Sequence, residues 1–288
     1  MTLFNIIVLA IVQGLAELLP VSSSAHVVVA EKLLGLDPSS PPMTLLLVML
    51  HTGTMFAVIV YFWRQWQGSY FRNAAAFKNI AVRVVLATAC TAVVGEIIIK
   101  VIEKTAFRDA PRAEIEDLFS HLELIAPALA AAGILILTAG LLEKRGASRS
   151  GPGTDPSLSQ AGLIGAVQGL CLPFRGFSRS GATISAAMLA GVAKARAEAF
   201  SFALAVVLTP PVVVREGLRL LRAQRENGDA HLAAVIWSCL LGAVVAFFAG
   251  LLALRWLSRW LEGGRWYLFG IYCLVASVAV MALHAAGY

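Results

Sequence analysis

Long apolar stretches recur along the chain, and they constrain its fold more than any other feature. A helix of about 20 apolar residues crosses the roughly 30 Å hydrocarbon core of a bilayer. Only 14% of the 288 residues are charged and the mean hydropathy is +0.79, whereas soluble domains carry about 25% charged residues. The alternating pattern of barrel strands is absent. We therefore predict an all-α integral membrane protein with six transmembrane helices, at 43–63, 80–102, 122–143, 198–214, 231–256 and 264–286.

Two further apolar runs are too short to cross a bilayer. Residues 2–12 and 160–171 are each followed by a break rich in Pro, Ser or Gly and by a second short run, at 24–36 and 182–193. A run of a dozen residues reaches only roughly 17 Å as a helix. We predict that each pair enters the membrane and turns back, as a re-entrant helix pair.

The letters VQGL occur in both short pairs, beginning at Val12 and Val167. Both halves have the order short helix, VQGL, polar break, short helix and full span, and three full spans between the pairs would invert the second copy. Four matching letters also arise by chance, but the shared proline, serines and short runs favour a repeat. We predict a single membrane domain over 1–288, with inverted repeats at about 1–143 and 160–286 and a Gly/Ser/Pro-rich linker at 145–159.

The net charge of +6 comes from basic residues in short loops between the spans. This pattern sets membrane topology, so we expect no nucleic-acid partner. Loops on the other side mix their basic residues with Asp and Glu, and we expect both termini and the opening of the first pair to face outward there. The loops predicted to be cytoplasmic hold Arg64, Arg72, Lys78, Lys144, Arg145, Arg149, Lys194, Arg196, Arg255, Arg259 and Arg265.

Glu17 lies one helical turn after Gln13, so both side chains share a face of the first short helix. An ionisable group at membrane depth is by default a functional candidate, and a glutamate that reaches interfacial water is the alternative. In the following PVSSSAH (20–26), proline ends one helix and serine caps the next, whose free N–H groups form an anion site. His26 adds a proton carrier or hydrogen-bond donor, which capping alone would not need.

The second break carries arginine. Arg175 and Arg179 flank it, and Ser178, Ser180 and Thr183 open the next short helix. The planar guanidinium of arginine matches phosphate oxygens and stays charged when buried. The alternative is that these side chains only extend to the cytoplasmic interface, and this alternative is stronger for Arg175 than for Arg179. A carboxylate, a histidine, hydroxyls and arginine at two helix N-termini together predict a phosphoryl-transfer site.

Other polar residues carry weaker predictions. His51 and Glu96 lie inside spans, where a supporting role at the site and a hydrogen bond between helices are equally plausible. No Walker loop, HExxH or dinucleotide motif is present. Interfacial placement explains His121, His231 and His284, and unpaired core packing explains Cys90, Cys171, Cys239 and Cys273.

The motifs GLAELLPVSSSAH, with Gln13 upstream, and GFSRSGAT resemble the two signatures of the undecaprenyl-diphosphate phosphatase family, the bacitracin-resistance membrane phosphatases. The likeness continues in HTGTMFAVIVYFW and AEAFSFALAV, so it covers essentially the whole chain. It implies six spans, two re-entrant pairs in inverted halves, and an outward-opening site in the bacterial inner membrane. It also implies hydrolysis of undecaprenyl diphosphate to the monophosphate, which recycles the lipid carrier for cell-wall synthesis. A divalent cation, Mg²⁺ or Ca²⁺, is the expected cofactor and a polyprenyl diphosphate lipid the expected partner, and a homodimer is left open.

The resemblance also assigns roles by motif position. Glu17 is similar to the family's essential glutamate and is the expected metal ligand, and Ser23 resembles the proposed nucleophile. His26 resembles the proton carrier, and Arg179 holds the diphosphate. The second motif is one residue longer than usual, which adds Arg175. The expected substrate contacts are Gln13, which stands where many members have glutamate, and Ser22, Ser24, Arg175, Ser178, Ser180 and Thr183.

A membrane transporter or flippase of an anionic lipid carrier is the rival interpretation, because carriers also combine inverted repeats with broken helices. A carrier needs binding groups but has no use for a carboxylate, a histidine and a hydroxyl placed together for catalysis. The sequence leaves open whether a phosphoserine forms or water attacks directly.

Overall fold

The computed structural model describes residues 2–37, 40–106, 121–145, 155–227, 232–261 and 264–287. These residues form α-helices and no strands, which confirms the predicted all-α class. The helices are α1 (Leu3–Leu18), α2 (Ser23–Leu33), α3 (Pro41–Ser69), α4 (Ala74–Ala106), α5 (Leu122–Lys144), α6 (Leu158–Cys171), α7 (Arg179–Leu189), α8 (Lys194–Asn227), α9 (Leu232–Leu261) and α10 (Trp266–Ala285).

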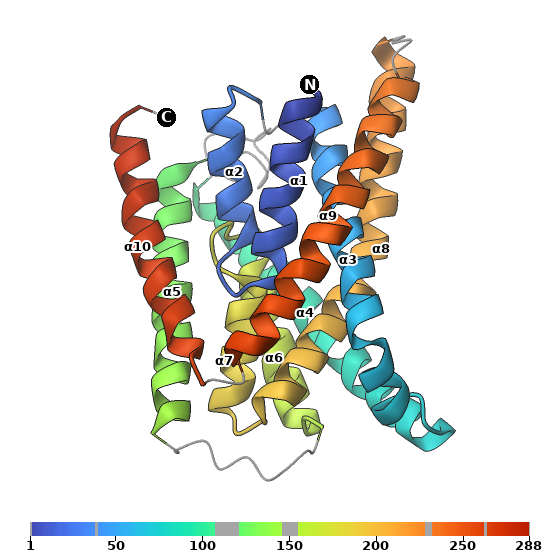
Figure 1. The fold of residues 1–288 in the computed structure, drawn as a ribbon, viewed down its shortest axis with the longest axis vertical. Helices are drawn as coiled ribbons and strands as arrows, with labels where there is room; N and C mark the ends of the chain where they lie inside the picture. The colour runs from blue at the N-terminus through green and yellow to red at the C-terminus, as the bar shows by residue number, and fades with distance from the viewer. Residues whose placement is uncertain are drawn as a thin grey trace.

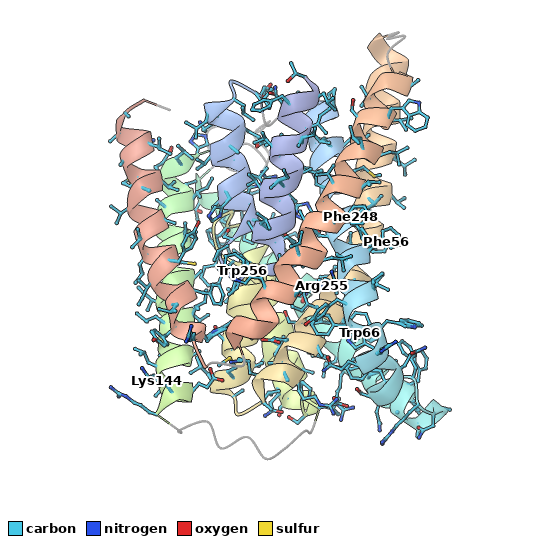
Figure 2. The ribbon with its side chains drawn as sticks, viewed as in Figure 1. Phe56, Trp66, Lys144, Phe248, Arg255 and Trp256 are labelled. Carbon is cyan, nitrogen blue, oxygen red and sulfur yellow. The ribbon has the colours of Figure 1, made fainter. Side chains whose placement is uncertain are left out.

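Six helices of the described part of the chain, α3, α4, α5, α8, α9 and α10, are long and apolar enough to cross a membrane, as predicted. Large apolar side chains cover their outer surfaces, as a lipid environment requires. Phe56 on α3 and Phe248 on α9 point outward in this way (Figure 2). Several helices are longer than the predicted spans, which covered only the apolar stretches. Helix α4, for example, begins at Ala74 rather than at residue 80.

The four short helices match the two predicted pairs, with shifted bounds; α7, for example, spans Arg179–Leu189 rather than 182–193. The first apolar run ends at residue 12, but α1 continues to Leu18, just before the turn at Pro20, so Gln13 and Glu17 lie on one helix as predicted. The VQGL segment therefore lies inside the helix and not at its end. Gly14 is tolerated there because it packs against another helix.

The two short pairs lie in opposite halves of the molecule, with their breaks at mid-height (Figure 1). Helices α1 and α2 occupy the half that holds both termini, and α6 and α7 occupy the other half. The side of the molecule opposite the termini, where Figure 2 labels Lys144, holds the last residues of α3 and α5 and the first residues of α4, α6, α8 and α10. The described ends of the loops predicted to be cytoplasmic thus share one end of the molecule.

The arrangement agrees with an inverted repeat, although the repeat and the re-entrant entry of the pairs remain predictions. Helix α1 packs on α9 and α6 packs on α4, which are corresponding helices of the exchanged halves. Most of the expected linker (146–154) and His231 lie outside the described residues.

The repeated VQGL letters have the same packing role in both halves. A Cβ at Gly14 would meet the Ala246 carbonyl oxygen of α9 at 2.8 Å, and a Cβ at Gly169 would meet the Thr91 carbonyl oxygen of α4 at 2.8 Å. Only glycine allows the short helices to approach the spanning helices this closely. The preceding glutamines are fully buried in both copies, so the repeated letters position each short helix.

Candidate active site

The two breaks meet in the middle of the bundle and contact each other directly. The backbone N–H of Gly176 donates to Ser24 Oγ at 3.3 Å, and Ser180 Oγ donates to the Leu19 carbonyl at 3.4 Å. Between the breaks lies a polar cavity of about 230 Å³. It is lined by Glu17, Ser22, Ser23, Ser24, His51, Cys171, Leu172, Phe174, Arg175, Phe177, Ser178, Arg179 and Ser180.

Glu17 is the centre of this cavity, and its carboxylate joins the two halves of the chain. Oε1 accepts a hydrogen bond from the Arg179 guanidinium, and Oε2 accepts one from the Ser23 hydroxyl. Gln13 Nε2 donates to Oε2 at 3.2 Å, and His51 Nε2 lies 3.5 Å from the same oxygen. Only 10% of the Glu17 side chain is exposed, so these contacts replace the water that an ionised carboxylate would otherwise require.

The first break presents Ser23 through a strained turn. Ser22, at the N-cap position of α2, has φ 65° and ψ 88°, a left-handed conformation that non-glycine residues seldom adopt. Its side chain makes no capping bond and instead pairs with Ser24 Oγ at 3.2 Å. Strained residues of this kind cluster at functional sites, where the surrounding structure enforces them. The turn brings Ser23 to Glu17 with its hydroxyl directed at the carboxylate.

The second break presents Arg179 at the start of α7. Ser178 is a capping residue, as predicted, because its Oγ accepts the Gly181 N–H at 3.2 Å. Gly176 has φ 101°, and a Cβ there would press on the backbone of Ile125. Arg179 is the first residue of α7, and the first backbone N–H groups of a helix have no partner within it and attract anions.

Thr183 lies behind the cavity. It is fully buried, and its Oγ1 donates to the Arg179 carbonyl at 2.8 Å and lies 2.6 Å from Ser201 Oγ of α8. It braces the first turn of α7. Of the predicted substrate contacts, Ser22, Ser24, Arg175, Ser178 and Ser180 line the cavity, whereas Gln13 reaches it through Glu17.

His26 is directed away from the polar cavity, and His51 lies closer to Glu17 than sequence reasoning placed it. His26 lines a separate apolar cavity, where its Nδ1 bonds the Ser22 carbonyl at 2.7 Å and its Nε2 bonds Tyr272 Oη at 2.6 Å. Its role as a proton carrier remains a prediction. His51 was predicted only to support the site or to form a hydrogen bond between helices, because no local sequence pattern links α3 to α1. Its position inside a span was the one feature of the sequence that indicated a functional role.

The remaining polar residues lie elsewhere. Glu96 pairs with Lys100 at 3.0 Å on the bundle surface, with 60% of its side chain exposed. His121 and His284 both lie against Glu123, at 2.6 and 3.5 Å. All four cysteines are free.

Comparison with known proteins identifies the family. The model of the family described as "Bacitracin resistance protein BacA" matches residues 6–279. The chain belongs to the BacA family. An "Undecaprenyl-diphosphatase 2" of Acinetobacter baylyi is 56% identical over 286 residues, which cover 98% of each chain. A protein of the same name from Burkholderia orbicola is 32% identical over 289 residues, covering 96% of this chain and 95% of its own. The resemblance drawn from the two motifs is confirmed.

The site of this BacA family member offers few protein ligands for a cation. In the part of the chain that the structure describes, no group of three or more His, Cys, Asp or Glu side chains could hold a metal ion. Glu17 is the carboxylate of the polar cavity. Magnesium is commonly held by one or two carboxylates together with substrate phosphates and water, so Glu17 fits a cation shared with a phosphorylated substrate.

Proposed function

We propose that this protein hydrolyses undecaprenyl diphosphate to undecaprenyl phosphate and inorganic phosphate, and so recycles a lipid carrier for cell-wall synthesis. The observation that carries the proposal is the convergence of Ser23, Glu17 and Arg179 from two breaks in one buried cavity. A hydroxyl held by a carboxylate, with a guanidinium beside both, provides a nucleophile, a base and charge stabilisation. The names of the full-length relatives support this substrate.

In this mechanism the diphosphate lies at the N-terminus of α7. Arg179 and the free N–H groups there bind its oxygens, and the phosphates compete with Glu17 for the guanidinium. Arg175 at the cavity wall adds positive charge. A divalent cation near Glu17 would neutralise the negative charge that builds up on the phosphates.

Ser23 Oγ then attacks the terminal phosphorus while Glu17 Oε2 accepts the hydroxyl proton. The bond from that phosphorus to the bridging oxygen breaks, and undecaprenyl phosphate leaves with the electron pair. Water then attacks the phosphoserine phosphorus, the bond from phosphorus to Ser23 Oγ breaks, Glu17 returns its proton to Ser23 Oγ, and inorganic phosphate is released. In the alternative route, Glu17 activates a water molecule that attacks directly, and Ser23 only orients it.

We propose that the protein lies in the bacterial inner membrane and that its site is reached from the outer side. Helices α1 and α2 lie in the half of the molecule that holds both termini (Figure 1), and the described ends of the basic loops lie at the other end, which the positive-inside rule assigns to the cytoplasm.

The decisive test is phosphate release by the purified protein in detergent from undecaprenyl diphosphate, with and without a chelator. We expect Arg179→Ala and Glu17→Gln to lower turnover by at least about 100-fold. Arg196→Ala and Glu96→Gln are matched controls, because Arg196 pairs with Asp155 at 3.3 Å and Glu96 is exposed, both outside the cavity. A folded parent protein that binds the lipid but releases no phosphate would refute the enzyme and favour the carrier.

A further inference from the structure

A second, larger cavity lies on the other side of the first break. It has a volume of about 570 Å³, and its wall includes Leu15, Leu19, Trp256 and Phe269. Among the described residues of its wall, only His26, Tyr272 and Trp256 have polar side-chain atoms. Leu15 is 37% and Tyr272 47% exposed, so the cavity reaches the surface of the bundle, where the surrounding lipid lies.

The first break forms the partition between the two cavities. Leu19, Val21 and His26 face the apolar cavity, whereas Ser22, Ser23 and Ser24 face the polar one. A diphosphate held beside Ser23 therefore has an apolar space next to it. This arrangement suits a ligand with an anionic head and a long hydrocarbon chain, because burying the chain stabilises the complex while the head stays bonded.

Two hydrogen bonds in series connect Tyr272 of α10 to the backbone of the first break. The Ser22 carbonyl can only accept, so His26 Nδ1 donates to it at 2.7 Å. In the neutral ring Nε2 is then the acceptor, and the Tyr272 hydroxyl donates to it at 2.6 Å. The two rings also stack, with centroids 5.6 Å apart. Tyr272 is thus connected through His26 to the strained residue that precedes Ser23.

Helix α10 is well placed to fix this connection. Cys273 Sγ lies 3.5 Å from the Pro20 carbonyl in the first break, and Trp266 Nε1 donates to Ser185 Oγ of α7 at 3.0 Å. The helix therefore contacts both short pairs. In apolar surroundings a hydroxyl keeps its partner, because no water replaces it.

We infer that Tyr272 is a positioning residue for the proposed hydrolysis: it lines the cavity that receives the prenyl chain next to the diphosphate, and through His26 it fixes the turn that presents Ser23. This inference rests on the proposed function. Binding of the chain against Tyr272 orders the same hydrogen bonds that orient the nucleophile.

The first experiment separates turnover from binding. Tyr272→Phe removes the hydroxyl and keeps the ring, and we expect kcat for undecaprenyl diphosphate to fall about tenfold, the effect of one lost hydrogen bond, with KM unchanged. Tyr267→Phe on the same helix is the control, because Lys144 Nζ contacts only its ring, 5.0 Å from the centroid. It should retain parental kcat.

A double variant tests whether Tyr272 acts through His26. Adding Tyr272→Phe to His26→Gln should cause no further loss, because the connection is already broken. If Tyr272→Phe alone keeps parental kcat, or if its effect multiplies with that of His26→Gln, the inference is wrong. A parent protein that releases no phosphate refutes instead the function on which the inference rests.

Filling the cavity tests its occupant. Leu15→Trp should raise KM for undecaprenyl diphosphate about tenfold, and leave inhibition by inorganic diphosphate, which has no chain, unchanged. Leu170→Trp, the corresponding position of the second VQGL, is the control because Leu170 is exposed and lies in neither cavity wall. An unchanged KM in Leu15→Trp, or an equal rise in the control, would show that the chain binds elsewhere.

Discussion

Arg179 donates a hydrogen bond to Glu17 across 162 residues of sequence, and this ion pair joins the two broken helix pairs. Arg179 opens α7 and Glu17 lies in the last turn of α1. Both side chains are largely buried, with 28% and 10% exposed. The contact fixes the relative position of the two breaks, so the same residues that serve chemistry also hold the site together.

The first prediction concerns the stability of this pair. Arg179→Met leaves the Glu17 carboxylate without its main partner, and the free energy of unfolding should fall by about 3 kcal/mol. The double variant Arg179→Met/Glu17→Gln should recover most of that loss, because no unpaired charge remains. Thermal unfolding in detergent measures both. If the double variant is no more stable than Arg179→Met, the charge is not the cause.

The second prediction concerns the backbone at Ser22. Ser22→Gly should leave stability unchanged or raise it by up to about 1 kcal/mol, because glycine adopts φ 65° without strain. Ser22→Val should destabilise by at least about 1 kcal/mol, since a β-branched side chain disfavours this conformation. Ser24→Gly is the comparison: Ser24 lies in the first turn of α2 and accepts the Gly176 N–H at 3.3 Å, so glycine there loses that hydrogen bond and should destabilise by about 1 kcal/mol. Equal effects of glycine at both positions would contradict the strained turn.

The sequence predicted the six spans, the two breaks and the serine cap of α7 because each depends on local composition. Apolar runs of spanning length, proline after a helix and serine before one act within a few residues. It also named most residues of the polar cavity, since each of the two motifs supplies a continuous stretch of them.

The misplaced details depend on packing between distant elements. The neighbour that His26 meets is Tyr272 of α10, 246 residues away in the sequence. Thr183 turns toward Ser201 of α8, and His51 approaches Glu17 because α3 packs on α1. Helix periodicity gives the face of each residue but not the neighbour that the face meets. The contact that makes glycine necessary at position 14 lies on α9, so the sequence of α1 alone does not reveal it.

The third prediction concerns the nucleophile. If Ser23 attacks phosphorus, Ser23→Ala should lower phosphate release by at least about 1,000-fold, and rapid quenching of the parent with terminally labelled substrate should trap label on the protein. Ser69→Ala is the control, because its hydroxyl bonds the Gln65 carbonyl at an exposed site on α3. Ser23→Ala that retains more than about a tenth of parental turnover would show that water attacks directly.

The last prediction concerns the cation and uses the repeated glutamines as a matched pair. Gln13→Glu places a second carboxylate beside Glu17, because Gln13 Nε2 now donates to Oε2 at 3.2 Å. Two adjacent carboxylates repel each other, so the variant should unfold at a lower temperature than the parent in chelator, and added Mg²⁺ or Ca²⁺ should raise its midpoint by more than it raises the parent's. Gln168→Glu is the control, since Gln168 is equally buried but bonds Thr91 Oγ1 at 3.2 Å with no carboxylate beside it. It should lose stability without a response to the cation. The readout is thermal unfolding and requires no turnover, so an equal response of both variants would show that the cation does not bind at Glu17.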